Sequence, residues 1–286
     1  MQVRLLPDTQ NNEMKASPAK KEFKNRFGQA NHFLITALVG IDGIQSGIIT
    51  EKPETFHTKW EPHDKKRSAD RTRVFVLKSF LGWAVESLEM YLTELNRKPK
   101  LLESEIFTTL FSKAGRSVYQ KTILIADELN IDPILIGLME VLITWRNYTF
   151  HYDIDNEIRE SSLKCLFDNK ENIKDRFSGL DIVQLKNTWE NGTDFTFKET
   201  ASLIKATQDF VNEIDEYILK NLDKERFLIE SVQKYFKESD LSYKRYLSFQ
   251  QEKKKKYLKI TIQNIVGENE VDDEVIENII DSLKKK

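Results

Sequence analysis

The chain has 286 residues, of which 40% are hydrophobic and 31% charged, and its formal net charge is −2. This balance excludes a disordered chain, and the single cysteine, Cys165, excludes an intrachain disulfide and a cysteine zinc site. We expect a cytoplasmic protein without membrane contact, because the longest apolar run, near residues 33–41, is far shorter than the ~20 residues of a membrane helix.

Apolar residues recur at helical spacing along most of the chain, and glycine and proline are few, so we expect an all-α protein. The helix from Asp132 has Pro133 in its first turn, where the missing N–H does no harm, and it runs into residues 146–151. Its stripe of core residues is expected to include Trp145 and Tyr148. The other expected helices cover residues 20–46, 70–97, 102–113, 116–129, 197–222, 224–237 and 241–257, with a short one from Asp272.

Composition divides the chain into three parts. Residues 1–18 are polar and lack periodicity, so we expect a loose leader. Residues 19–222 carry most of the apolar periodicity and are expected to form the main helical domain, with two short helices in the polar stretch 153–192. From residue 223 lysine and glutamate dominate, which predicts a charged helical C-terminal extension over 223–286.

Residues 146–151, with the sequence RNYTFH, stand at the end of the most apolar predicted helix. Arg146 supplies a permanent positive charge with fork-shaped donors that match phosphate oxygens. His151 supplies a group that takes or gives a proton near neutral pH. These two side chains are the minimum that is needed to cleave RNA through its own 2′-hydroxyl without a metal.

The spacing of arginine and histidine alone is a weak signal, because Arg26 and His32 satisfy it as well. Asn147 strengthens the first occurrence, since it lies four positions before His151 and shares its helix face. Arg146 and His151 are five positions apart, about 140° around an ideal helix, so one straight helix cannot aim both at one point. In the simpler alternative, Arg146 pairs with a carboxylate and His151 contacts the last helix carbonyls.

Arg146, Asn147 and His151 at the end of an apolar helix resemble the signature of the HEPN superfamily (higher eukaryote and prokaryote nucleotide-binding). The resemblance covers about residues 20–222. It implies a helical bundle that dimerises so that both copies of the motif line one cleft. In active members it also implies metal-independent RNA endonuclease activity that leaves a 2′,3′-cyclic phosphate and a 5′-hydroxyl. Many such members are toxins or effectors of phage defence.

We expect Arg146 to hold the scissile phosphate, His151 to transfer the proton, and Asn147 to orient the imidazole or contact phosphate. The resemblance further implies that a polar residue of the long helix, Glu86 or Glu89, contacts the arginine; the alternative for both is ion pairing on the surface. No metal or cofactor is expected. The expected partners are an RNA substrate, a second copy of the chain that completes the active site, and an antitoxin or another defence protein.

Two other interpretations stay open: a non-catalytic HEPN-like module that binds RNA or a protein partner, and a structural helical scaffold. Because the net charge is close to zero, contact with RNA would depend on local basic clusters. A solvated helix face is the simpler interpretation of each cluster. The clusters are Lys20, Lys21, Lys24 and Arg26; Lys65, Lys66, Arg67, Arg71 and Arg73; and residues 253–256.

Overall fold

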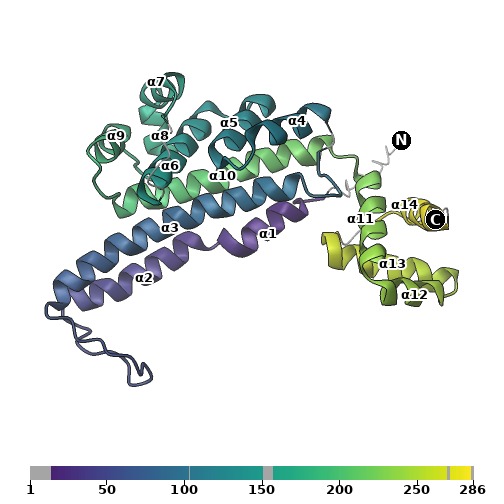
Figure 1. The fold of residues 1–286 in the computed structure, drawn as a ribbon, viewed down its shortest axis with the longest axis horizontal. Coiled ribbons are helices and arrows are strands. Elements are labelled where there is room, and N and C mark those ends of the chain that lie inside the picture. The colour runs from purple at the N-terminus through teal and green to yellow at the C-terminus, as the bar shows by residue number, and fades with distance from the viewer. Residues whose placement is uncertain (1–13, 103, 151–156, 269–270, 285–286) are drawn as a thin grey trace, which may run out of the picture. The chain divides into compact units, whose positions relative to one another are not determined.

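The computed structural model describes residues 14–102, 104–150, 157–268 and 271–284. These residues form fourteen α-helices and no strand, which confirms the all-α class (Figure 1). None of these helices is long and apolar enough to cross a membrane. Contacts divide the described residues into two compact units. The helical body comprises Lys20–Glu94 and Ser104–Ile214, and the terminal unit comprises the described residues of Met1–Ala19, Leu95–Glu103 and Asp215–Lys286.

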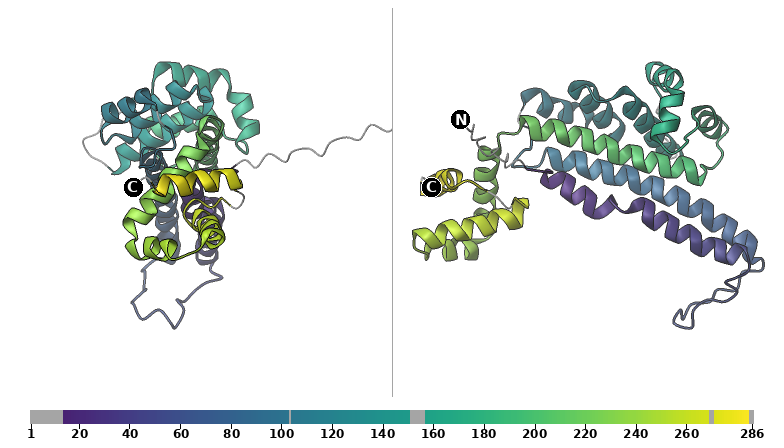
Figure 2. Two further views of the ribbon diagram at one scale, coloured as in Figure 1. Left: turned by 90° about the vertical axis from the view of Figure 1, so that its right-hand side faces the viewer. Right: turned by 180° about the vertical axis from the view of Figure 1, so that it is seen from behind.

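The helices before residue 222 are α1 (Pro18–Phe27), α2 (Ala30–Gln45), α3 (Lys65–Leu95), α4 (Glu105–Ala114), α5 (Val118–Leu129), α6 (Pro133–Phe150), α7 (Glu160–Asp168), α8 (Lys170–Arg176), α9 (Ile182–Glu190) and α10 (Phe197–Asn221). In the body, α1 and α2 run along one side of α3, and α10 runs along the other (Figures 1 and 2). Leu81, Val85, Leu88 and Leu92 of α3 are fully buried, because they recur at helical spacing on the face between these neighbours.

Three predicted boundaries in the body were wrong. The expected helix 20–46 is two helices, and a Cβ on Gly28 at the break would lie 2.5 Å from the Lys24 carbonyl oxygen. The long helix begins at Lys65 instead of residue 70, because the Asp64 carboxylate accepts the Arg67 N–H at 3.0 Å and caps a first turn that has no apolar periodicity. The stretch 153–192 contains three short helices, α7 to α9, instead of two.

The terminal unit contains α11 (Lys224–Glu238), α12 (Asp240–Leu247), α13 (Gln251–Val266) and α14 (Asp273–Lys284). The prediction of a single helix over 241–257 was wrong, since the helix is interrupted between the end of α12 and the start of α13. The apolar face of α14 packs on α11 and α13. The buried carboxylate of Asp215 accepts hydrogen bonds from the N–H and the hydroxyl of Ser17. The predicted division of the chain at residue 222 stays a prediction.

Candidate functional site

Helix α6 is apolar around most of its circumference and is packed on nearly all sides. Its first turn begins with Pro133, and the Asp132 carboxylate accepts the Ile134 N–H at 2.9 Å. Near the other end of α6, Arg146 and Asn147 are both buried. The polar part of the 146–151 motif therefore begins inside the packed body and not on a solvated surface.

Among the described residues, one carboxylate and one amide contact the guanidinium of Arg146. Its Nη2 lies 3.2 Å from Oε1 of Glu86 on α3, and its Nη1 donates to Oδ1 of Asn147 at 3.0 Å. The Arg146 side chain is 8% exposed, whereas the Glu86 side chain is 65% exposed. A charge taken out of water needs such partners, so α3 and α6 together fix this guanidinium just beneath the surface.

A second ion pair lies one turn further along α3. Glu89, three residues after Glu86, has its Oε1 3.9 Å from Nζ of Lys121 on α5. The Lys121 side chain is only 11% exposed, so this pair is also partly withdrawn from water. Helix α3 thus provides one carboxylate to α6 and one to α5, and Glu86 is the one that reaches Arg146.

The end of α6 packs on α3 at Gly82, one turn before Glu86. A Cβ on Gly82 would lie 3.4 Å from Cε2 of Phe150, so the glycine lets this ring approach the α3 backbone. Trp145 lies in the core as predicted and stacks on Phe195, with the ring centroids 4.9 Å apart. The same prediction for Tyr148 was wrong: it is 77% exposed, because it lies on the face of α6 away from this packing.

His151 lies outside the described residues, so its expected place beside Asn147 stays a prediction. The Asn147 amide oxygen accepts from Arg146, which leaves the amide NH₂ as the group for the expected contact with imidazole or phosphate. The second arginine–histidine spacing differs in its surroundings. Arg26 pairs on the surface with Glu22 at 2.6 Å, and His32 is exposed on the next helix.

A buried carboxylate in the middle of α6, which we did not predict from the sequence, is surrounded by hydrogen-bond donors; we call this group the Glu140 cluster. Glu140 is 0% exposed, and its oxygens accept from the Arg159 N–H at 2.8 Å, the Arg159 Nε–H at 2.8 Å, the Tyr119 hydroxyl at 3.3 Å and the Ser162 hydroxyl. The signal that could have found it is a single acid within the apolar helix 133–145. Such an acid requires donors from neighbouring elements.

The Glu140 cluster fixes the chain where it enters α7. Arg159 also pairs with Asp127 of α5 at 3.0 Å, and the Tyr119 hydroxyl donates to the carbonyl oxygen of Glu157 at 2.7 Å. A pocket of about 260 Å³ beside Arg159 is lined by Cys165, whose thiol pKa is raised by burial and by Asp132. The Glu140 oxygens are already filled with donors, so this carboxylate is a structural anchor and not a base.

Tyr119 makes the cluster sensitive to high pH. Burial and the neighbouring Glu140 carboxylate raise the pKa of Tyr119 to about 12, against about 10 for an unfolded tyrosine. The protonated phenol therefore stabilises the fold fully below pH 10, and this contribution is lost as the pH rises from about 10 to 12.

Replacing Tyr119 by phenylalanine is expected to lower the free energy of unfolding at pH 8 by about 1 kcal/mol, because the one hydroxyl hydrogen that is shared between the Glu157 carbonyl oxygen and Glu140 is lost. The difference in the free energy of unfolding between the variant and the unmodified chain should become smaller towards pH 12, since the variant has no phenol at this position to titrate. Urea unfolding at several pH values measures both, with Tyr148→Phe as the matched exposed control. A gap that stays constant with pH would contradict this role of Tyr119.

Across the described ranges no group of three or more histidine, cysteine, aspartate or glutamate side chains is arranged to hold a metal ion. No protein-family model, curated protein or solved structure matches the chain.

Proposed function

We propose that the chain is a metal-independent RNA endonuclease of the HEPN type, with Arg146 and His151 as its catalytic residues. The observation that carries the proposal is the environment of Arg146: a buried guanidinium at the end of an apolar helix, held by Asn147 and by Glu86 of α3. A guanidinium used only for a surface ion pair would gain little from burial, because withdrawing it from water is costly.

The chemistry requires the RNA to attack itself. The 2′-oxygen forms a bond to the adjacent phosphorus while the bond from phosphorus to the 5′-oxygen breaks. One proton leaves the 2′-hydroxyl and another reaches the 5′-oxygen, so the products are a 2′,3′-cyclic phosphate and a 5′-hydroxyl. We assign proton transfer to His151 and stabilisation of the added phosphoryl charge to Arg146.

The exposure of Glu86 suits this role. Its carboxylate neutralises Arg146 in the absence of RNA, but it lies in water and can turn away at little cost. A phosphate that approaches from the surface would then replace Glu86 as the anionic partner of Arg146. Asn147 lies deeper and would keep the guanidinium oriented during the exchange.

The proposal includes a homodimer whose two copies of the motif form one composite cleft. The reason is the separation of about 140° between Arg146 and His151 on an ideal helix, which a second copy of the chain resolves. The proposed biological role is a toxin or phage-defence effector, controlled by an antitoxin or another protein of the same defence system.

The purified 286-residue chain is expected to cleave single-stranded RNA in the presence of EDTA and to leave 2′,3′-cyclic phosphate ends. His151→Ala should abolish this cleavage, because no other group of the motif transfers protons near neutral pH. His32→Ala is the matched control, since it alters the histidine of the second arginine–histidine spacing and should leave the rate unchanged. Gel analysis of end-labelled RNA, with mapping of the product ends, measures both.

Undiminished cleavage by the His151→Ala variant would remove histidine from the mechanism. RNA binding without any cleavage by the unmodified chain would favour the non-catalytic module. Neither binding nor cleavage would favour the structural scaffold.

A further inference from the structure

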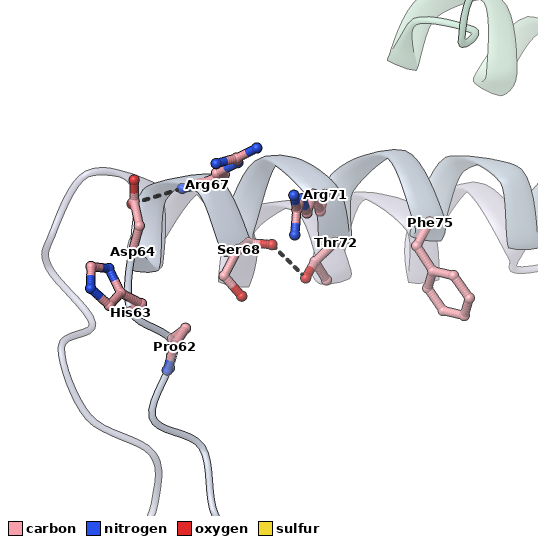
Figure 3. A pocket seen from close by; sticks show the side chains of 8 residues that line it. All are labelled: Pro62, His63, Asp64, Arg67, Ser68, Arg71, Thr72 and Phe75. Carbon is pink, nitrogen blue, oxygen red and sulfur yellow. Dashed lines mark hydrogen bonds between the residues drawn. The ribbon is translucent and has the colours of Figure 1, made fainter.

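The start of α3 and the loop before it form a second polar site in the helical body. A pocket of about 660 Å³ is lined by eight residues from this region (Figure 3). They are Pro62, His63, Asp64, Arg67, Ser68, Arg71, Thr72 and Phe75. Positions 67, 71 and 75 are spaced by four residues, so two arginines and one aromatic ring follow each other along neighbouring turns of one helix.

The two arginines of this pocket are not neutralised by the carboxylates around them. Arg67 and Arg71 are exposed, and neither guanidinium forms an ion pair with the part of the chain that the structure describes. Among the nearby acids, Asp42 pairs with Arg73, Asp70 accepts from the Gln45 amide at 2.6 Å, and Asp64, which also lines the pocket, caps α3. The pocket therefore presents two arginine forks to an anionic ligand.

An exposed aromatic ring lies one helical turn beyond Arg71 (Figure 3). Phe75 is 69% exposed, although burying a phenylalanine ring is normally favourable. The Thr72 hydroxyl, between Arg71 and Phe75 along the helix, donates to the Ser68 carbonyl oxygen at 2.8 Å, so it is held in place on the helix (Figure 3). Guanidinium forks next to an exposed ring match a ligand that carries both phosphates and flat bases.

We propose that this pocket binds single-stranded RNA, with Arg67 and Arg71 on neighbouring phosphates and Phe75 stacked on a base. The charges complement a polyanion, and the ring accepts any base, so binding is independent of sequence. A duplex keeps its bases stacked inside and cannot use Phe75. The inference rests on the proposed function for the identity of the polyanion, but it does not depend on the chemistry at Arg146.

The test is binding of a fluorescent single-stranded oligonucleotide in which every 2′-hydroxyl is methylated, so that attack by this hydroxyl is impossible. The double variant Arg67→Glu/Arg71→Glu is expected to bind it roughly tenfold more weakly or worse at low salt. The double alanine variant should reduce the slope of log affinity against log salt by about 1.4, the value for two phosphate contacts on a single strand. Fluorescence anisotropy gives both quantities.

Phe75→Ala should weaken binding of the single strand by about tenfold and leave duplex binding unchanged, because only an unpaired base stacks on the ring. The matched control is Lys170→Glu/Lys174→Glu on α8, which reverses two exposed cations at the same spacing in the same unit and should bind as the unmodified chain does.

Equal weakening by the Arg67/Arg71 and Lys170/Lys174 variants would overturn the inference, because a general effect of net charge would then explain the loss. Absence of binding by the unmodified chain would also overturn it, and so would binding of an acidic protein at this pocket in place of RNA. The two proposals fail separately. If the Arg67/Arg71 variant still cleaves RNA and binds it normally, only the proposed RNA-binding pocket is contradicted. If the unmodified chain binds RNA through this pocket but does not cleave it, only the proposed endonuclease activity is contradicted.

Discussion

Replacing Arg146 by alanine is expected to lower the rate of RNA cleavage by at least about 10²-fold, the usual cost of removing one preorganised donor from a developing oxyanion. The added charge on the phosphoryl oxygens would lose a guanidinium that is already fixed by Glu86 and Asn147. Arg146→Lys should recover little of the rate, because an ammonium group cannot present two parallel donors. Single-turnover cleavage assays measure the effect on the chemical step.

The Arg146 variants need a structural control, since this side chain is buried and its removal leaves the Asn147 oxygen without its arginine donor. Circular dichroism and thermal unfolding establish whether each variant is folded. Glu86→Gln is the matched change on the other side of the contact. It removes the competing charge and is expected to keep the maximal rate and lower the apparent KM. If folded Arg146→Ala and Arg146→Lys chains cleave RNA at the normal rate, Arg146 has no catalytic role and only forms an ion pair.

Replacing Arg159 by alanine is expected to lower the free energy of unfolding by about 3–5 kcal/mol, the range for removing one partner of a buried ion pair. The variant keeps the fully buried Glu140 carboxylate and its backbone donor at residue 159, but it removes the charged Nε–H donor. It also removes the ion pair between Arg159 and Asp127. The Tyr119 and Ser162 hydroxyls remain, and they cannot neutralise the charge.

Urea unfolding at neutral pH measures this loss. Arg26→Ala removes an exposed pair with Glu22 and should cost less than about 1 kcal/mol, so it controls for the loss of an arginine as such. The double variant Glu140→Met/Arg159→Met should be more stable than Arg159→Ala, because no buried charge is left without a partner. Similar losses for Arg159→Ala and Arg26→Ala would contradict the account of Glu140 as a buried charge.

Apolar periodicity was enough to predict the all-α class, because a helix that packs on one side repeats its buried positions regularly. It failed where polar chemistry sets the boundary. The capped first turn of α3 has no apolar pattern, and Gly28 divides α1 from α2 within a stretch that remains periodic across the break. Tyr148 fits the apolar stripe of α6, yet only the packing of Phe150 on Gly82 shows which face of the helix end is covered.

The candidate site could be predicted only in part. Arg146 and Asn147 were predicted from the sequence. Glu86 and Glu89, three residues apart on one helix, remained alternatives for the residue that contacts Arg146. Choosing between them required the register of α3 against α6 and α5, which places Glu86 at Arg146 and Glu89 at Lys121. The Glu140 anchor escaped prediction because its donors come from two other segments, α5 and the start of α7, and no local pattern brings them together.

The uninterrupted length of α3 has a consequence for substrate size. Arg67 and Glu86 are nineteen residues apart on this one helix, which corresponds to about 29 Å along its axis. A stacked strand that rises about 3.4 Å per nucleotide needs roughly eight or nine nucleotides to cover that distance. Helix α3 would then act as a molecular ruler, and fragments shorter than this would reach the arginine pocket or Arg146 within one chain, but not both.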